Sequence, residues 1–154
     1  MSAFFLDSSA LVKRYVQEAG TAWVRQRTGP EADHDPYIAL IAGAEGVAAL
    51  MRQQRTGGLE SEDAAAALAA FRQEFAGLYH VVAINGSVIE KAMGLAEAHP
   101  LRGYDAVQLA AALHVQRWRA VVGLDPLTFV SADTTLNAAA DGEGLAVEDP
   151  NQHD

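Results

Sequence analysis

Short apolar runs alternate along this chain with longer segments whose apolar residues recur every three or four positions. The run Phe4–Leu6 is too short for a helix and predicts a buried strand. A very short strand is expected near Tyr37. Further strands are expected over 79–84, in the segment 127–133, where the strand runs into a turn, and over 145–149. Helices are expected over 8–18, 21–27, 40–54, 87–99, 104–119 and 134–142, with one more starting at 61. This alternation predicts a three-layer α/β/α sandwich with a mainly parallel central sheet.

Several residues are suited to the ends of these helices. Asp7 or Ser8 can cap the first helix, which we expect to stop at Gly20. Ser61 can cap the helix that follows the "RTGG" turn, and the acidic residues after it favour a first helical turn. No internal repeat or linker divides the chain. We therefore expect one domain over 1–150 and a short C-terminal tail over 151–154.

Composition narrows the functional classes. The 154 residues contain no cysteine, which excludes disulfides and thiolate metal sites and fits a reducing cytoplasm. No apolar run approaches the length of a membrane span, and no signal peptide is apparent, so we expect a cytoplasmic protein without membrane contact. The formal net charge of −9 argues against a general nucleic-acid binder. The acidic residues are either ordinary solvated surface, or some of them are gathered at a cation site. In the second case the acidic surface would also suit a basic partner.

Four carboxylates stand out against this pattern. Asp7 and Asp133 follow predicted strands, and the carboxyl ends of parallel strands are where such sheets bind ligands. Asp105 falls in the first turn of a predicted helix. Glu45 lies on a helix that is apolar on both sides, so it must be paired, protonated or metal-bound. Simpler explanations are a helix cap for each aspartate and a salt bridge to Arg52 for Glu45.

Taken together, the four carboxylates suggest a shared site. Strand ends of neighbouring units converge in this type of fold, so these side chains can meet in one pocket. Carboxylates that close repel one another, and a divalent cation removes the conflict. Oxygen ligands without histidine or cysteine favour Mg²⁺ or Mn²⁺ over zinc. Such a centre is suited to the attack of an activated water on a phosphodiester.

The sequence resembles the PIN-domain ribonucleases, and among them the VapC-type toxins of bacterial toxin–antitoxin pairs. The resemblance covers nearly the whole chain and is carried by "FLDSSALVKRY", "ALIAGAEGVAAL", "LRGYDAVQLAAAL" and "FVSADTTLNAAADGEGLAVEDP". It implies an α/β/α sandwich, a Mg²⁺-dependent endoribonuclease, and neutralisation by a small cognate antitoxin that usually carries basic residues. The acidic residues of the family fall on Asp7, Glu45, Asp105 and Asp133, and the hydroxyl two positions after the first falls on Ser9. We expect Ser9 to hydrogen-bond Asp7 or a metal-bound water, or otherwise to cap the first helix.

One segment departs from the family pattern. The family usually has a hydroxyl near the entry of the glutamate helix, whereas here the segment reads "PYIALIAGAE". Ala39 and Ala42 leave this helix without a side-chain cap. The same helix has more apolar residues than one core face needs, which suggests a homodimer contact.

Three other functions fit parts of the pattern. A haloacid-dehalogenase-like phosphatase also starts with a strand-end aspartate, but it needs a second acid where Ser9 stands. A receiver domain needs a lysine near the last strand, and the lysines here are Lys13 and Lys91. The main alternative is a catalytically inactive PIN-like scaffold that binds protein or RNA.

Overall fold

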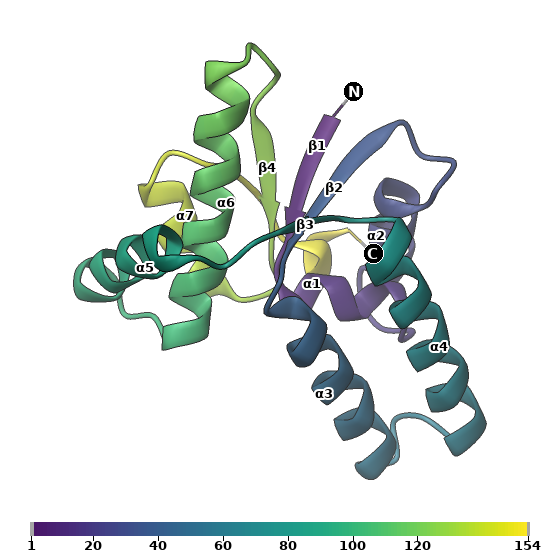
Figure 1. Cartoon of the computed structure of the whole chain (residues 1–154). Helices are drawn as coiled ribbons and strands as arrows, with labels where there is room; N and C mark the ends of the chain where they lie inside the picture. The colour runs from purple at the N-terminus through teal and green to yellow at the C-terminus, as the bar shows by residue number, and fades with distance from the viewer. Residues whose placement is uncertain (1, 154) are drawn as a thin grey trace.

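The computed structural model describes residues 2–153 and is built around a five-stranded sheet (Figure 1). The strands lie in the order β3-β2-β1-β4-β5, and all four pairings are parallel. Their bounds are β1 Ser2–Leu6, β2 His34–Ala39, β3 His80–Val82, β4 Leu127–Val130 and β5 Ala146–Glu148. The chain runs outward from β1 to β2 and β3 on one side, and to β4 and β5 on the other. β1 and β4 are therefore the neighbours at which the strand order reverses.

Helices follow the strands on both faces of the sheet. They are α1 Ser8–Leu11 with a 3₁₀ turn η1 Val12–Arg14, α2 Thr21–Thr28, α3 Ala42–Arg55, α4 Ser61–Gly77, α5 Gly86–Ala98, α6 Gly103–Val121, α7 Thr134–Gly142 and η2 Pro150–Gln152. In Figure 1, α5, α6 and α7 lie on one side of the sheet, and α1, α2 and α4 lie on the other. This arrangement confirms the predicted three-layer sandwich.

The period of two along the strands divides the interior into two cores. Alternate residues, Ala3 and Phe5, face α5, α6 and α7, and their neighbour Leu6 packs with α1 to α4. The pattern repeats in the neighbouring strands. Tyr37, Ala39, Leu127 and Phe129 belong to the first core, and Ile38 and Val130 belong to the second. A strand buried on both faces reads as a continuous apolar run, as Phe4–Leu6 does.

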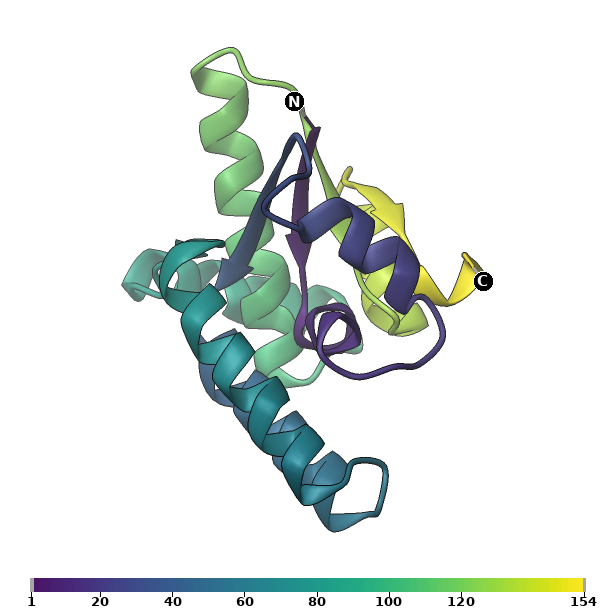
Figure 2. The same cartoon turned by 90° about the vertical axis from the view of Figure 1, so that its right-hand side faces the viewer.

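The helices α3 and α4 form a hairpin that reaches beyond the carboxyl edge of the sheet (Figure 2). Gly46 allows close packing, because a Cβ atom built there would lie 2.7 Å from Cζ of Phe71. The C-terminal end of α4 is bonded to η1 through Arg14, which donates to both carboxylate oxygens of Glu74 at 2.9 and 2.7 Å. The α3 helix of this hairpin forms one wall of the space at the strand ends.

The first helical segment is shorter than predicted. We expected a helix to about residue 18, but η1 ends at Arg14. The hydroxyl of Thr21 accepts from the backbone N–H of Glu18 at 2.9 Å and donates to the carbonyl of Val16 at 3.0 Å. These bonds satisfy backbone groups that a continued helix would have paired, so the chain turns into α2.

One further local prediction was wrong, and the strand expected near Tyr37 is present but longer than expected. Ser61 does not cap α4, because Glu60 is the residue at the cap and the Ser61 hydroxyl instead accepts from Gln54 Nε2 at 3.0 Å. The strand expected near Tyr37 has six residues and includes Pro36. Pairing with β1 and β3 on its two sides extends this strand beyond what its own sequence indicates.

The C-terminal segment packs against α2. Pro150 is buried and its carbonyl approaches Gly20, which adopts a left-handed φ of 84°. The ring of His153 stacks on Trp23 at a centroid distance of 4.6 Å. The expected domain 1–150 begins at position 1, and the expected tail 151–154 ends at position 154. Both positions lie outside the described residues. Within residues 2–153, no helix is long and apolar enough to cross a membrane.

Candidate active site

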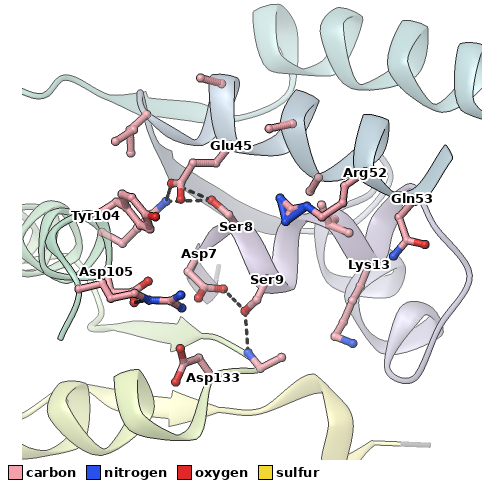
Figure 3. Close-up of a pocket in the computed structure, with 18 of the residues that line it drawn as sticks. Asp7, Ser8, Ser9, Lys13, Glu45, Arg52, Gln53, Tyr104, Asp105 and Asp133 are labelled. Atoms are coloured by element: carbon pink, nitrogen blue, oxygen red, sulfur yellow. Dashed lines mark hydrogen bonds and ion pairs between the residues drawn. The ribbon is translucent and has the colours of Figure 1, made fainter. Parts of the chain in front are cut away.

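An open pocket of about 780 Å³ lies at the carboxyl ends of β1 and β4. All four predicted carboxylates line it, although they come from four separate segments of the chain. Asp7 follows β1, Asp133 follows β4, Glu45 comes from α3 and Asp105 from the first turn of α6. Figure 3 shows their side chains around one space, with Asp7 near its centre. The parallel topology brings them together, as the sequence predicted.

Asp7 is the most buried of the four, with 4% of its surface exposed. It caps α1, since its Oδ1 accepts from the backbone N–H of Ala10 at 3.0 Å and from the Ser9 hydroxyl at 2.7 Å. Its Oδ2 accepts from the Ser131 hydroxyl at 2.7 Å. Burial raises the pKa of Asp7 from 3.8 to about 6, against the lowering effect of these hydrogen bonds, and the nearby charge of Asp105 raises it slightly more.

The cap of Asp7 and its predicted contact with Ser9 are both confirmed. The two roles considered for Asp7 do not compete. One oxygen makes the cap while the carboxylate still lines the pocket. Ser9 does more than predicted, because its oxygen also accepts from the backbone N–H of Ala132 at 3.0 Å. It therefore links the loop after β1 to the loop after β4.

Asp133 is held by the helix that follows it. Its Oδ1 accepts from the backbone N–H groups of Thr135 at 2.9 Å and Leu136 at 3.1 Å, which makes Asp133 the N-cap of α7. Its own N–H donates to the Ser131 hydroxyl at 3.0 Å. Oδ2 takes no part in the cap. Asp133 therefore presents one fixed carboxylate oxygen to its helix and the other to the pocket side of the loop.

Glu45 is half-buried and lies in polar surroundings, which corrects the expectation of a hydrocarbon environment. Its Oε1 accepts from the Ser8 hydroxyl at 3.0 Å and from Gln108 Nε2 at 2.8 Å. The expected alternative partner, Arg52, forms no ion pair with it among the described residues. The error came from counting every alanine on α3 as buried, whereas Ala44 and Ala48 are exposed.

Asp105 is paired with a cation from its own loop. Arg102 Nε lies 3.3 Å from its Oδ2, and the arginine side chain is 73% exposed. The hydrogen bond to Asp105 raises the pKa of Arg102, and the charge of Asp133 contributes less. The guanidinium therefore lies in the field of two of the four carboxylates, where it offsets part of their repulsion.

The donor chemistry of the pocket fits a hard divalent cation. The candidate ligands are carboxylate oxygens, with serine hydroxyls behind them, and no histidine lines the pocket. The raised pKa of Asp7 reflects a buried carboxylate that a cation would stabilise in its charged form. In the part of the chain that the structure describes, however, no three acidic or histidine side chains are close enough to hold an ion as they stand.

Three polar residues of the site were not predicted. Ser131 joins Asp7 to the backbone of Asp133, while Ser8 and Gln108 hold Glu45. Gln108 is 2% exposed, and within residues 2–153 its Oε1 has no hydrogen-bond partner. Spacing offered a signal for each. Ser8 adjoins Asp7, Ser131 precedes Asp133 by two residues, and Gln108 lies one helical turn after Asp105, on the same face.

The fold and the pocket together define an α/β/α sandwich with an acidic site at the point where the strand order reverses. No protein-family model and no curated protein sequence matches this chain significantly. Solved structures do match its fold. FitAcB from Neisseria gonorrhoeae superposes with a TM-score of 0.65 at 17% identity, over 97% of this chain and 99% of that one.

Two other structures share the same architecture. PAE2754 from Pyrobaculum aerophilum gives a TM-score of 0.60 at 19% identity, over 98% of this chain and 85% of that one. VapBC-1 from nontypeable Haemophilus influenzae gives 0.58 at 12% identity, over 96% of this chain and 98% of that one. These comparisons confirm the PIN-like fold that the sequence resemblance implied.

Proposed function

We propose that this protein is a divalent-metal-dependent endoribonuclease that acts as a toxin of the VapC type. The observation that supports it most is the meeting of Asp7, Glu45, Asp105 and Asp133 in one pocket at the carboxyl edge of the sheet. Carboxylates are rarely gathered in this way without a cation, because their like charges repel one another. The substrate would be RNA, and the site of action would be the cytoplasm.

In this proposal, Asp7, Asp105 and Asp133 would hold Mg²⁺ or Mn²⁺, with Glu45 as a further ligand or a partner of a bound water. Such an ion activates a water and neutralises phosphate oxygens. The remaining residues keep the carboxylates oriented. Ser9 fixes Oδ1 of Asp7, as Ser131 fixes Oδ2, and the backbone N–H groups at the start of α7 fix Asp133. Positioning of this kind lowers the reorganisation needed during the reaction.

Substitution of Asp7 by asparagine tests the proposal. Asparagine keeps the cap of α1 but removes the charge, so Asp7→Asn is expected to abolish RNA cleavage while leaving the circular dichroism spectrum unchanged. The matched control is Asp141→Asn, the same chemical change at an exposed position of α7 outside the pocket. Cleavage of a labelled RNA should require Mg²⁺ or Mn²⁺ and stop with EDTA. Cleavage by Asp7→Asn at the wild-type rate would rule out the assigned role.

An inactive scaffold is a second candidate, and two observations favour it. Arg102 forms an ion pair with the carboxylate of Asp105. In addition, no three acidic or histidine side chains in the described region are close enough together to hold one ion. The same cleavage assay separates the two candidates. A chain that binds RNA equally with Mg²⁺ and EDTA, and never cleaves it, would be a binding module.

We also propose a small basic antitoxin as the protein partner. The fold shared with FitAcB and VapBC-1 supports a toxin of this class, and the net charge of −9 suits a positively charged partner. Basic side chains entering the pocket would meet five carboxylates, those of Asp7, Glu18, Glu45, Asp105 and Asp133. A cation supplied by the partner would compete there with the metal or with RNA.

A further inference from the structure

The pocket has a basic side as well as an acidic one. Arg52, on the last turn of α3, lines the same cavity as the four carboxylates. In Figure 3 its side chain lies on the side of the pocket that also carries Lys13, away from Asp105 and Tyr104. A ligand that extends from the acidic centre along α3 therefore reaches a guanidinium.

Arg52 differs from the other two cations of the pocket in having no partner. Lys13 is buried and donates to the carbonyl of Ala19 at 2.7 Å and to Glu18 at 3.2 Å. Arg102 is paired with Asp105. Among residues 2–153, the exposed guanidinium of Arg52 forms neither an ion pair nor a hydrogen bond, since Glu45 bonds Ser8 and Gln108 instead.

An unpaired guanidinium beside an acidic centre suits a ligand that carries several negative charges along its length. Its planar set of N–H donors matches the oxygens of a phosphate group, which it can bind in a bidentate manner. A single RNA strand presents such groups in succession. The net charge of −9 opposes RNA binding to the chain as a whole, so an available cation inside the pocket influences where the RNA lies.

We propose that Arg52 binds a phosphate of the RNA strand adjacent to the phosphate that is cleaved, and thereby positions the substrate across the carboxylates. This inference rests on the proposed function, because it requires RNA in this pocket. It adds a residue outside the acidic set, and it gives the path of the RNA from the carboxylates along α3 to Arg52.

The test compares Arg52→Ala with Arg55→Ala in the full-length protein. Both arginines are exposed in the last turn of α3, so each substitution removes the same charge from the same helix end. Arg55 instead lines the groove between α3 and α4, with Met51 and Phe71. Binding of a fluorescent single-stranded RNA is measured by anisotropy in EDTA at several salt concentrations. Initial cleavage rates are measured in Mg²⁺.

We expect Arg52→Ala to weaken RNA binding by about five- to twenty-fold, the effect of losing one charge-assisted phosphate contact. The slope of log K against log salt should fall by about 0.7, the value for one phosphate on a single strand. Arg52→Lys should restore the slope but only part of the affinity. Arg55→Ala should change affinity less than about twofold. In Mg²⁺, Arg52→Ala should raise KM with little change in kcat.

The possible results separate this inference from the proposed function. Equal effects of Arg52→Ala and Arg55→Ala on affinity and slope, with wild-type cleavage intact, would overturn the role of Arg52 alone. Binding that depends on Arg52 without cleavage in Mg²⁺ or Mn²⁺ would overturn the nuclease and leave the phosphate contact standing. A wild-type chain that neither binds nor cleaves RNA would overturn both.

Discussion

Asp7 shows how one side chain is held in a state that its surroundings disfavour. The carboxylate is almost fully buried, and burial raises its pKa to about 6. Three donors, from Ser9, Ser131 and the backbone of Ala10, partly offset this penalty. At neutral pH the charged form is therefore retained at a cost in stability, which is typical of a group placed for binding or catalysis.

This cost predicts a pH-dependent gain in stability for Asp7→Asn. The folded state holds the proton of Asp7 up to a pH of about 6, whereas the unfolded chain releases it near 3.8. Between these values the folded state binds more protons, so the wild-type protein loses stability as the pH rises. At pH 7.5 the full shift corresponds to about 3 kcal/mol, an upper bound, and we expect Asp7→Asn to be about 1–3 kcal/mol more stable.

Urea denaturation of both proteins in EDTA at pH 7.5 and pH 4 measures this difference. The stability gain should shrink toward zero at pH 4, where the Asp7 carboxyl is protonated in the folded protein. Asp141→Asn, on an exposed helix position, should match the wild type at both pH values. A stability difference that is the same at the two pH values would contradict the pKa assigned to Asp7.

At the level of single residues, the sequence identified the charged groups better than the groups that hold them. An aspartate directly after an apolar strand stands out in the sequence, and each of the four acids does line the pocket. Ser131 and Gln108 leave only a weaker signal, their spacing from Asp133 and Asp105. A serine or glutamine becomes significant only when folding places it against a carboxylate that is distant in sequence, as Gln108 lies against Glu45.

Among the elements, the α3–α4 hairpin depends most on close packing. Gly46 lies against the ring of Phe71, where a Cβ atom would come within 2.7 Å of Cζ and 2.8 Å of Cε2. Phe71 is itself buried in the second core. The ring cannot easily move aside, so the absence of a side chain at position 46 sets the distance between the two helices.

We therefore expect opposite effects from alanine at two helical glycines. Gly46→Ala should lower the free energy of unfolding by about 1–3 kcal/mol through overpacking. Gly94→Ala, at an exposed position of α5 with no atom within 4 Å of the added carbon, should raise it by about 0.5–1 kcal/mol. Thermal and urea denaturation of the two variants measure both values. Equal effects would show that the α3–α4 contact is looser than described.

Element boundaries were predictable where a local signal decided them. Asp133 and Asp7 each cap a helix with a side-chain oxygen, so the starts of α7 and α1 follow from the sequence. Asn85 caps α5 in the same way, but this cap was not predicted. The end of the first helical segment did not follow from the sequence, because the hydroxyl of Thr21 takes over the backbone groups of Val16 and Glu18. That competition depends on how the chain turns, which periodicity does not encode.

For the whole molecule, the exposed apolar residues at the start of the glutamate helix support the proposed homodimer. Leu40, just before α3, is 50% exposed. Ala44 and Ala48, which also line the rim of the acidic pocket, continue an exposed apolar strip along the helix. An apolar strip of this kind on a monomer commonly marks an interaction site.

Sedimentation velocity should accordingly give about twice the chain mass of 16.3 kDa. Leu40→Glu places a charge on the strip and should shift the protein to 16.3 kDa without loss of helical content. Met93→Glu, at an exposed position of α5, controls for a general effect of added charge. A wild-type protein that sediments as a monomer at all concentrations would contradict the dimer.

The sequence by itself determined the layered architecture and the chemical character of the site. Apolar runs of strand length between amphipathic helices lead to a parallel sheet covered on both faces, and strand-end carboxylates in such a sheet lie at its carboxyl edge. These conclusions need only local periodicity and chain connectivity, so they are available without coordinates.

Tertiary structure alone decided which groups satisfy those carboxylates and which cations remain available. Glu45 pairs with Ser8 and Gln108, leaving Arg52 free among the described residues, and Arg102 pairs with Asp105. The reason is physical. Hydrogen bonds and ion pairs act over a few ångströms, so a partner many residues away is set by how elements pack and not by the pattern along either one.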